Sequence, residues 1–148
     1  MQNRHETDPV ITRAAQAGDV AAMLACDAYA QAHASRGDAV RVAVGKGHCQ
    51  VAMRAGQVAG YVLTHDDFFG YGFVSLVIVA PGQQRRGVGL RLLAAAEAAC
   101  QTAKLFTSTN QSNLAAQRLF ASAGFVRSGQ IDHLDEEDPE LVYVKWCR

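Results

Sequence analysis

A short stretch with two arginines and two glycines separates two apolar runs near the middle of the chain. It follows the apolar run 73–81, opens an alanine-rich run, and consists of Gln84, Arg85, Arg86, Gly87, Val88 and Gly89. Where a strand enters a helix through a glycine-bearing turn, the first helical N–H groups lack an intrahelical partner, and the helix dipole adds partial positive charge. Such a junction is a seat for an anion, most often a phosphate. We expect the glycines to admit the ligand to the backbone and the arginines to attract it.

Two familiar phosphate-binding loops do not fit this stretch. The P-loop of nucleoside triphosphatases needs Gly-Lys followed by Ser or Thr, which is absent here. The Rossmann fingerprint needs a third glycine or alanine at the position of Leu92. ATP and NAD are therefore disfavoured as ligands, and a plain turn with solvated arginines remains open at this point.

The composition limits the partners of the chain. Its 148 residues suit one domain over 1–148, and its 14 basic residues balance 14 acidic ones. A neutral chain has no global footprint for nucleic acid. The start lacks a signal-peptide pattern and no run approaches a membrane span, so we expect a cytoplasmic protein without membrane contact. The four cysteines form no C-x-x-C pair, which favours reduced thiols and no metal.

The hydrophobic pattern predicts a mixed sheet with helices on its faces, an α/β (α+β) domain. Strands are expected at 10–15, 49–53, 58–63, 73–81, 104–109, 125–131 and 140–146. Helices are expected at 18–34, 36–47, 87–103 and 112–124.

A second motif lies downstream of the first. Residues 113–125 read N-L-A-A-Q-R-L-F-A-S-A-G-F, and residues 84–89 read Q-R-R-G-V-G. At this separation the two segments resemble the motifs N-x-x-A-x-x-L-Y-x-x-x-G-F and [QR]-x-x-G-x-[GA] of the GNAT acetyltransferases. The resemblance covers nearly all of 10–146, most specifically 76–125. It implies a mixed, mostly antiparallel seven-stranded sheet with about four helices, and an acetyl-CoA-dependent N-acetyltransferase acting on a primary amine.

The resemblance also implies site residues. The backbone of 84–89 would hold the CoA pyrophosphate, and the end of the preceding strand, Ile78 and Val79, would pair with the pantetheine amides. Asn113 would hydrogen-bond the pantetheine arm, and Phe120 would lie beside the thioester.

Two positions depart from the family pattern. Phe120 replaces a tyrosine that often serves as general acid, but a thiol with a pKa near 8.5 can leave as thiolate. Ser75 is the only polar side chain on a strand where many members carry a glutamate base. An amine nucleophile must still lose a proton. The candidates for that base are His65, Asp66, Asp67 and Glu140.

Acidic and aromatic residues suggest the acceptor. Acidic residues occur in 64–72 and 131–141, near the aromatic residues Phe68, Phe69, Tyr71 and Tyr143. Carboxylates beside aromatic rings suit a cationic small-molecule amine. A peptide or protein acceptor, solvated loops with no such role, and a CoA-binding sensor without turnover remain open. The apolar final strand could join the sheet edge of a partner in a homodimer.

Overall fold

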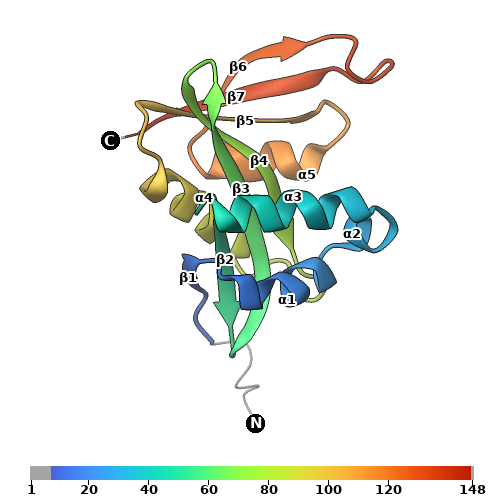
Figure 1. Cartoon of the computed structure of the whole chain (residues 1–148). Helices are drawn as coiled ribbons and strands as arrows, with labels where there is room; N and C mark the ends of the chain where they lie inside the picture. The colour runs from blue at the N-terminus through green and yellow to red at the C-terminus, as the bar shows by residue number, and fades with distance from the viewer. Residues whose placement is uncertain (1–7, 148) are drawn as a thin grey trace.

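The computed structural model describes residues 8–147. These residues form seven strands and five α-helices (Figure 1). The strands are β1 (Ile11–Ala14), β2 (Cys49–Arg54), β3 (Gln57–Phe68), β4 (Tyr71–Val79), β5 (Lys104–Asn110), β6 (Val126–Ile131) and β7 (Glu140–Trp146). The helices are α1 (Val20–Ala25), α2 (Ala28–Ala32), α3 (Ala34–Gly45), α4 (Val88–Ala99) and α5 (Leu114–Ser122), with a 3-10 turn, η2, at Ala17–Asp19.

The strands form one sheet in the order β1-β2-β3-β4-β5-β7-β6. Every neighbouring pair is antiparallel except β4 and β5, which run parallel. The expected mixed, mostly antiparallel seven-stranded sheet is therefore confirmed. The final strand, β7, lies between β5 and β6, so its predicted role as a free edge for a partner is wrong. The edges of the sheet are β1 and β6.

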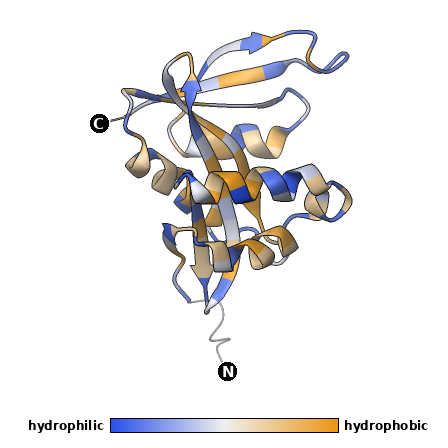
Figure 2. Cartoon of the chain, in the orientation of Figure 1, coloured by the Kyte–Doolittle hydropathy of each residue, from blue (hydrophilic) through white to orange (hydrophobic). Residues whose placement is uncertain are grey.

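Helices cover both faces of the sheet. The apolar stripe of α4, with Val88 and Leu92, packs with Val62 and Leu105 in one core that also includes Phe120 of α5. The other face carries α1 and α3, whose buried side chains join a second core cluster with β2 and β3. Figure 2 shows hydrophobic residues concentrated along the central strands and the helix faces that meet them.

The first predicted helix, 18–34, is wrong as a single element. It divides into η2, α1 and α2, and the break falls at Asp27, whose backbone is extended. Asp27 caps α2 by accepting from the backbone N–H of Tyr29 at 3.1 Å. Its carboxylate, 3% exposed, also accepts from Tyr61 at 2.8 Å and from Arg36 at 2.6 Å. Burial and this carboxylate raise the pKa of Tyr61 above its ordinary value. The break therefore places a buried carboxylate that links α2 and α3 to strand β3 of the sheet.

Candidate active site

The connection from β4 to α4 begins with a tight turn. The N–H of Gln83 donates to the carbonyl of Ala80 at 3.0 Å, and Gly82 has φ +85°. With Pro81 at the second position, this is the pattern of a type II turn. The N–H of Ala80 donates to the carbonyl of Ala59 at 2.8 Å, which fixes the turn to β3.

The stretch 84–89 follows this turn and leads into α4. Arg85 and Gly87 both have left-handed backbone, with φ +62° and +77°, while Gln84 and Arg86 do not. Alternation of this kind turns successive N–H groups toward one concavity, which binds anions. Gly87 is the N-cap of α4, and a side chain there would meet no atom within 4 Å. The geometry therefore provides an open anion seat at a helix N-terminus.

Gly89 lacks a side chain because of helix packing, not because of access to the anion seat. A Cβ added at Gly89 would lie 3.0 Å from both terminal carbons of Leu119 on α5. Its lack of a side chain lets the two helices approach, whereas Gly87 is the glycine with open space around it.

A cleft opens where β4 and β5 separate. Their parallel pairing runs over three positions and ends at Val74 opposite Thr107. On the other side of β4, Thr64 pairs with Val74 and Leu63 with Leu76, so Ser75 is an extra, bulged residue. A bulge bends its strand and interrupts pairing. The Thr107 hydroxyl donates to the Val74 carbonyl at 3.0 Å, which locks the point of separation.

The cleft has a volume of about 200 Å³. Backbone groups of β4 beyond Val74 have no strand partner on the β5 side, so an extended ligand with amide groups can pair with them. The cleft is lined by Val74, Ser75, Leu76, Val77, Thr107, Ser108, Thr109, Asn113, Ala116, Leu119 and Phe120.

Two predicted residues lie in this lining. Asn113 caps α5, its side-chain oxygen accepting from the N–H of Ala116 at 3.1 Å, which leaves its NH₂ group for a ligand. Phe120 is 5% exposed and packs edge-on against Tyr143, with ring centroids 5.4 Å apart. Ile78 and Val79 lie further along β4, where their side chains pack against the two cores and are not part of the cleft lining.

The candidate bases fall into separate places. The His65 imidazole contacts the Asp67 carboxylate and stacks on Phe73 at 5.2 Å. Glu140 is half-buried at the start of β7, opposite Asn110. Phe73 pairs with Phe106, four residues before Asn110 on β5, which separates the two candidates by about 13 Å along the sheet.

Three of the four predicted aromatic residues lie together. Phe68 packs against Phe73 at 4.7 Å and against Phe106 at 5.2 Å, and Phe69 meets Phe68 edge-on at 5.0 Å. Tyr71 packs against Phe106 at 5.8 Å. Tyr143, by contrast, is 8% exposed in the core beside α5 and is not brought together with this cluster.

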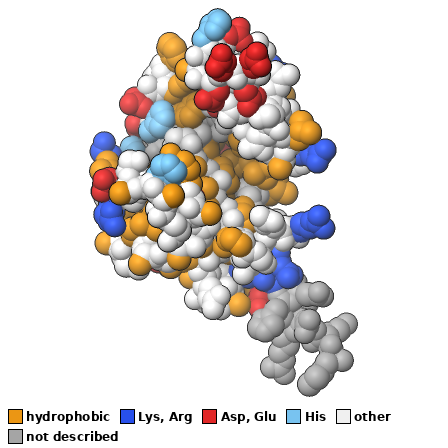
Figure 3. All heavy atoms as spheres, turned by 90° about the vertical axis from the view of Figure 1, so that its right-hand side faces the viewer, with side chains coloured by type: hydrophobic (Ala, Val, Ile, Leu, Met, Phe, Trp, Pro, Cys, Tyr) orange, Lys and Arg blue, Asp and Glu red, His pale blue; other side chains and the backbone are white. Residues whose placement is uncertain are grey.

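The acidic segment between β6 and β7 is fixed to the end of β5. Asp135 accepts from Asn110 at 2.7 Å, and Asp138 accepts from the Ser112 hydroxyl at 2.6 Å. Among residues 8–147, no lysine or arginine forms a salt bridge with any carboxylate of 132–140. Figure 3 shows acidic side chains gathered at the top of one face, above a hollowed surface. Because Ser112 directly precedes Asn113, this unneutralised charge lies beside the cleft.

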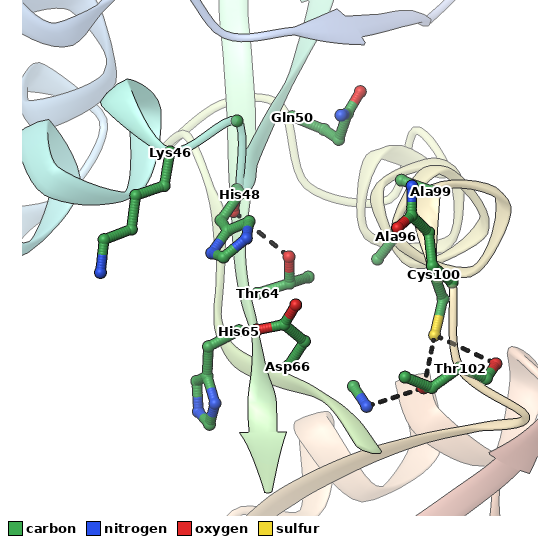
Figure 4. A pocket seen from close by; sticks show the side chains of 13 residues that line it. Lys46, His48, Gln50, Thr64, His65, Asp66, Ala96, Ala99, Cys100 and Thr102 are labelled. Atoms are coloured by element: carbon green, nitrogen blue, oxygen red, sulfur yellow. Dashed lines mark hydrogen bonds between the residues drawn. The ribbon is translucent and has the colours of Figure 1, made fainter. Parts of the chain in front are cut away.

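A second cavity, of about 280 Å³, lies at the opposite end of α4 from the anion seat. Its lining includes Lys46, His48, Asp66 and Cys100. In Figure 4, Asp66 points toward the α4 side while His65 points away from it. Both Asp66 and His65 belong to the lining of this second cavity, and neither lines the cleft between β4 and β5.

Two features are not found in residues 8–147. No group of three or more metal-ligating side chains occurs among them. None of their helices is long and apolar enough to cross a membrane.

The fold, together with the anion seat at 84–89 and the adjoining cleft between β4 and β5, indicates the class of protein. Residues 19–125 match the Acetyltransferase (GNAT) family, and the chain belongs to this family of acetyltransferases.

Solved structures agree with this assignment. A GNAT-family acetyltransferase from Bacillus cereus ATCC 10987 has 30% identity and a TM-score of 0.90, over 95% of this chain and 99% of that one. YncA from Salmonella typhimurium, solved with its cofactor acetyl-CoA, has 22% identity and a TM-score of 0.74, over 94% of each chain. Ard1 from Thermoplasma volcanium has 15% identity and a TM-score of 0.80, over 94% of this chain and 98% of that one. None of the curated protein sequences compared with this chain matches it.

Proposed function

We propose that this protein transfers an acetyl group from acetyl-CoA to the primary amine of a cationic small molecule. The observation that carries this proposal is the continuity of two features. The anion seat at 84–89 and the cleft beyond Val74 are connected by one strand, β4. A ligand with a pyrophosphate at one end and an amide-bearing arm at the other fits that arrangement.

Each part of the donor has a partner in the chain. The backbone N–H groups of 84–89 hold the pyrophosphate, with charge added by Arg85 and Arg86. Backbone groups of Leu76 and Val77 that face the β5 side, where they have no strand partner, hydrogen-bond the pantetheine amides, and the NH₂ group of Asn113 donates to the same arm. This places the reactive end of the donor near the bulge in β4.

The chemistry is one of positioning. Acetyl-CoA supplies an acetyl group on a good leaving group, since a thiol with a pKa near 8.5 departs as thiolate. Phe120 therefore packs beside the reacting end without donating a proton. A backbone N–H at the Ser75 bulge polarises the carbonyl, and holding the amine nearby supplies several kcal/mol of the barrier.

Among the candidate bases we propose His65 for its chemistry; it lines the cavity at the other end of α4 and not the cleft between β4 and β5. Histidine commonly transfers protons near neutral pH, and the contact with the Asp67 carboxylate orients the His65 ring. Glu140 and water are the remaining routes for the proton of the amine.

The cationic acceptor follows from the charge beside the cleft. The carboxylates of 132–140 are not neutralised by salt bridges within residues 8–147, and Asp135 and Asp138 hold their segment next to Asn113. A polycationic amine gains both attraction and orientation there.

The experiment is CoA release with acetyl-CoA and a panel of amines, followed with a thiol reagent. The panel holds a polyamine, an aminoglycoside, amino acids, peptides with free N-termini and a neutral amine. We expect release with the cationic small molecules, falling when Glu136 and Glu137 are both changed to Gln. Burial raises the pKa of Cys49 to about 12, and burial beside Cys100 raises that of Cys147 to about 12, so these two thiols contribute little background at neutral pH.

Two outcomes would replace this proposal. Release confined to the peptides would make the protein a peptide N-acetyltransferase. Tight acetyl-CoA binding with no release above background across the whole panel would make it a sensor, for which the missing hydroxyl at Phe120 is the supporting feature.

A further inference from the structure

Arg54, the last residue of β2, is a buried cation that has no anionic partner among residues 9–147. Arg54 is 6% exposed, and one guanidinium nitrogen, Nη1, donates to the Gln83 side-chain oxygen at 3.1 Å. The other nitrogen, Nη2, is buried and has no hydrogen-bond partner. A buried charge is costly unless it is paired.

Three other cations of the fold pair with carboxylates, in contrast to Arg54. Arg13, Arg36 and Lys145 each contact a carboxylate at 2.6–2.7 Å. No carboxylate among residues 9–147 forms such a contact with Arg54. The cost of burying this guanidinium is therefore not offset by an acidic side chain of these residues.

The position of Arg54 relates it to the anion seat. Within residues 9–147 its side chain has one hydrogen-bond partner, Gln83, which closes the tight turn and directly precedes the stretch 84–89. The sequence from 68 to 96 contains three arginines and no acidic residue. A charge buried in a low-dielectric interior acts more strongly on its neighbours than a solvated one. Arg54 therefore adds positive charge next to a segment that contains arginines and no acidic residue.

We infer that Arg54 is a positioning residue for the phosphate groups of CoA. It acts in two ways, by holding the turn through Gln83 and by supplying an unneutralised charge close to the phosphate-binding stretch. This inference rests on the proposed use of acetyl-CoA. Since Nη2 is shielded from solvent, Arg54 acts through the loop and through its field rather than by direct contact.

The test separates a role toward phosphate from a role in packing. Arg54→Met, which removes the charge and keeps much of the volume, is compared with Arg54→Lys, which keeps the charge. Gln83→Ala removes the contact and leaves the charge. Two ligands are titrated into each variant: CoA by calorimetry, and pantetheine, which lacks the phosphates, by NMR shift changes.

We expect Arg54→Met to bind CoA about ten- to a hundred-fold more weakly and with less dependence on salt. Its affinity for pantetheine should stay within about twofold of the parent protein. Arg54→Lys should restore most of the affinity for CoA, and Gln83→Ala should lose less than Arg54→Met. Arg54→Gln is the second neutral variant if Arg54→Met does not fold.

An equal loss for both ligands would show a packing role and overturn the inference, as would unchanged CoA binding in the neutral variants. Failure of the parent protein to bind CoA at all would overturn this inference and the proposed function together. CoA binding without CoA release would remove only the proposed catalysis, because the comparison of variants uses binding alone.

Discussion

Gly87 offers a direct way to place a charge in the anion seat without disturbing the fold. It is the N-cap of α4, has φ +77°, and a side chain there would meet no atom within 4 Å. Asp and Asn both tolerate left-handed backbone and are both favoured N-caps. Gly87→Asp and Gly87→Asn are therefore a matched pair that differ in charge alone.

The expected size of the effect follows from Coulomb's law. A carboxylate about 5 Å from one phosphate charge is repelled by about 3 kcal/mol at an effective dielectric constant of about 20. Salt and partial exposure reduce this to about 1–2 kcal/mol, which is roughly a five- to thirty-fold loss of affinity. Stability should move in the opposite direction, because a negative charge at a helix N-terminus stabilises the helix by about 0.3–1 kcal/mol.

The assay is calorimetric titration of acetyl-CoA into both variants at low and physiological salt, with thermal unfolding of each. We expect Gly87→Asp to bind at least about tenfold more weakly than Gly87→Asn at low salt while melting at the same or a higher temperature. Equal affinity of the two variants would refute the placement of the pyrophosphate. A lower Tm for Gly87→Asp would show that its loss of acetyl-CoA affinity comes from impaired folding instead.

Three other changes test separate parts of the account. Thr107→Val removes the hydroxyl that locks the separation of β4 and β5, and should cost about 1–3 kcal/mol in urea unfolding together with weaker acetyl-CoA binding; unchanged binding would show that the lock is unnecessary. Asn113→Asp keeps the cap of α5 and removes the amide donor, so KM for acetyl-CoA should rise with stability nearly unchanged, whereas Asn113→Ala should also lose about 1 kcal/mol of stability. Arg13 holds the pKa of Asp19 at about 2 through a direct hydrogen bond. This pair therefore stabilises the fold above pH ~4, and its contribution is lost as the pH falls toward 2. The free energy of unfolding should depend less on pH in Asp19→Asn than in the parent protein.

The turn at 84–89, its junction with α4 and the element order could be predicted because their signals are local. A strand-like apolar run, a glycine-bearing turn and an amphipathic helix occur within residues 73–103, and local patterns of this kind fix element type. The same local pattern did not distinguish Gly87 from Gly89. That difference depends on Leu119, which only the folded helix pair brings into contact.

The cleft could be predicted only through family resemblance. Ser75 stood out as a lone polar residue in an apolar strand, but its bulge depends on the register of β4 against β3. Thr107 carried a weak signal, a threonine alternating with the buried Leu105. Its partner carbonyl lies on another strand, 33 residues away.

Two buried polar side chains were missed for the same reason. Asp27 interrupts an alanine-rich segment that favours a continuous helix, and its partner Tyr61 lies 34 residues along the chain. Arg54 falls between the expected strands 49–53 and 58–63, in a turn of the kind where a solvated charge is usual. Only the packing of β2 near the turn at Gln83 reveals its burial.

A crystal structure with CoA bound tests the central claim most directly. The account predicts the pyrophosphate on the backbone N–H groups of 84–89 and the pantetheine arm beside Ser75, Leu76 and Val77 in the cleft between β4 and β5. CoA bound in the cavity at the other end of α4, near Cys100, or bound without phosphate contacts to 84–89, would contradict it.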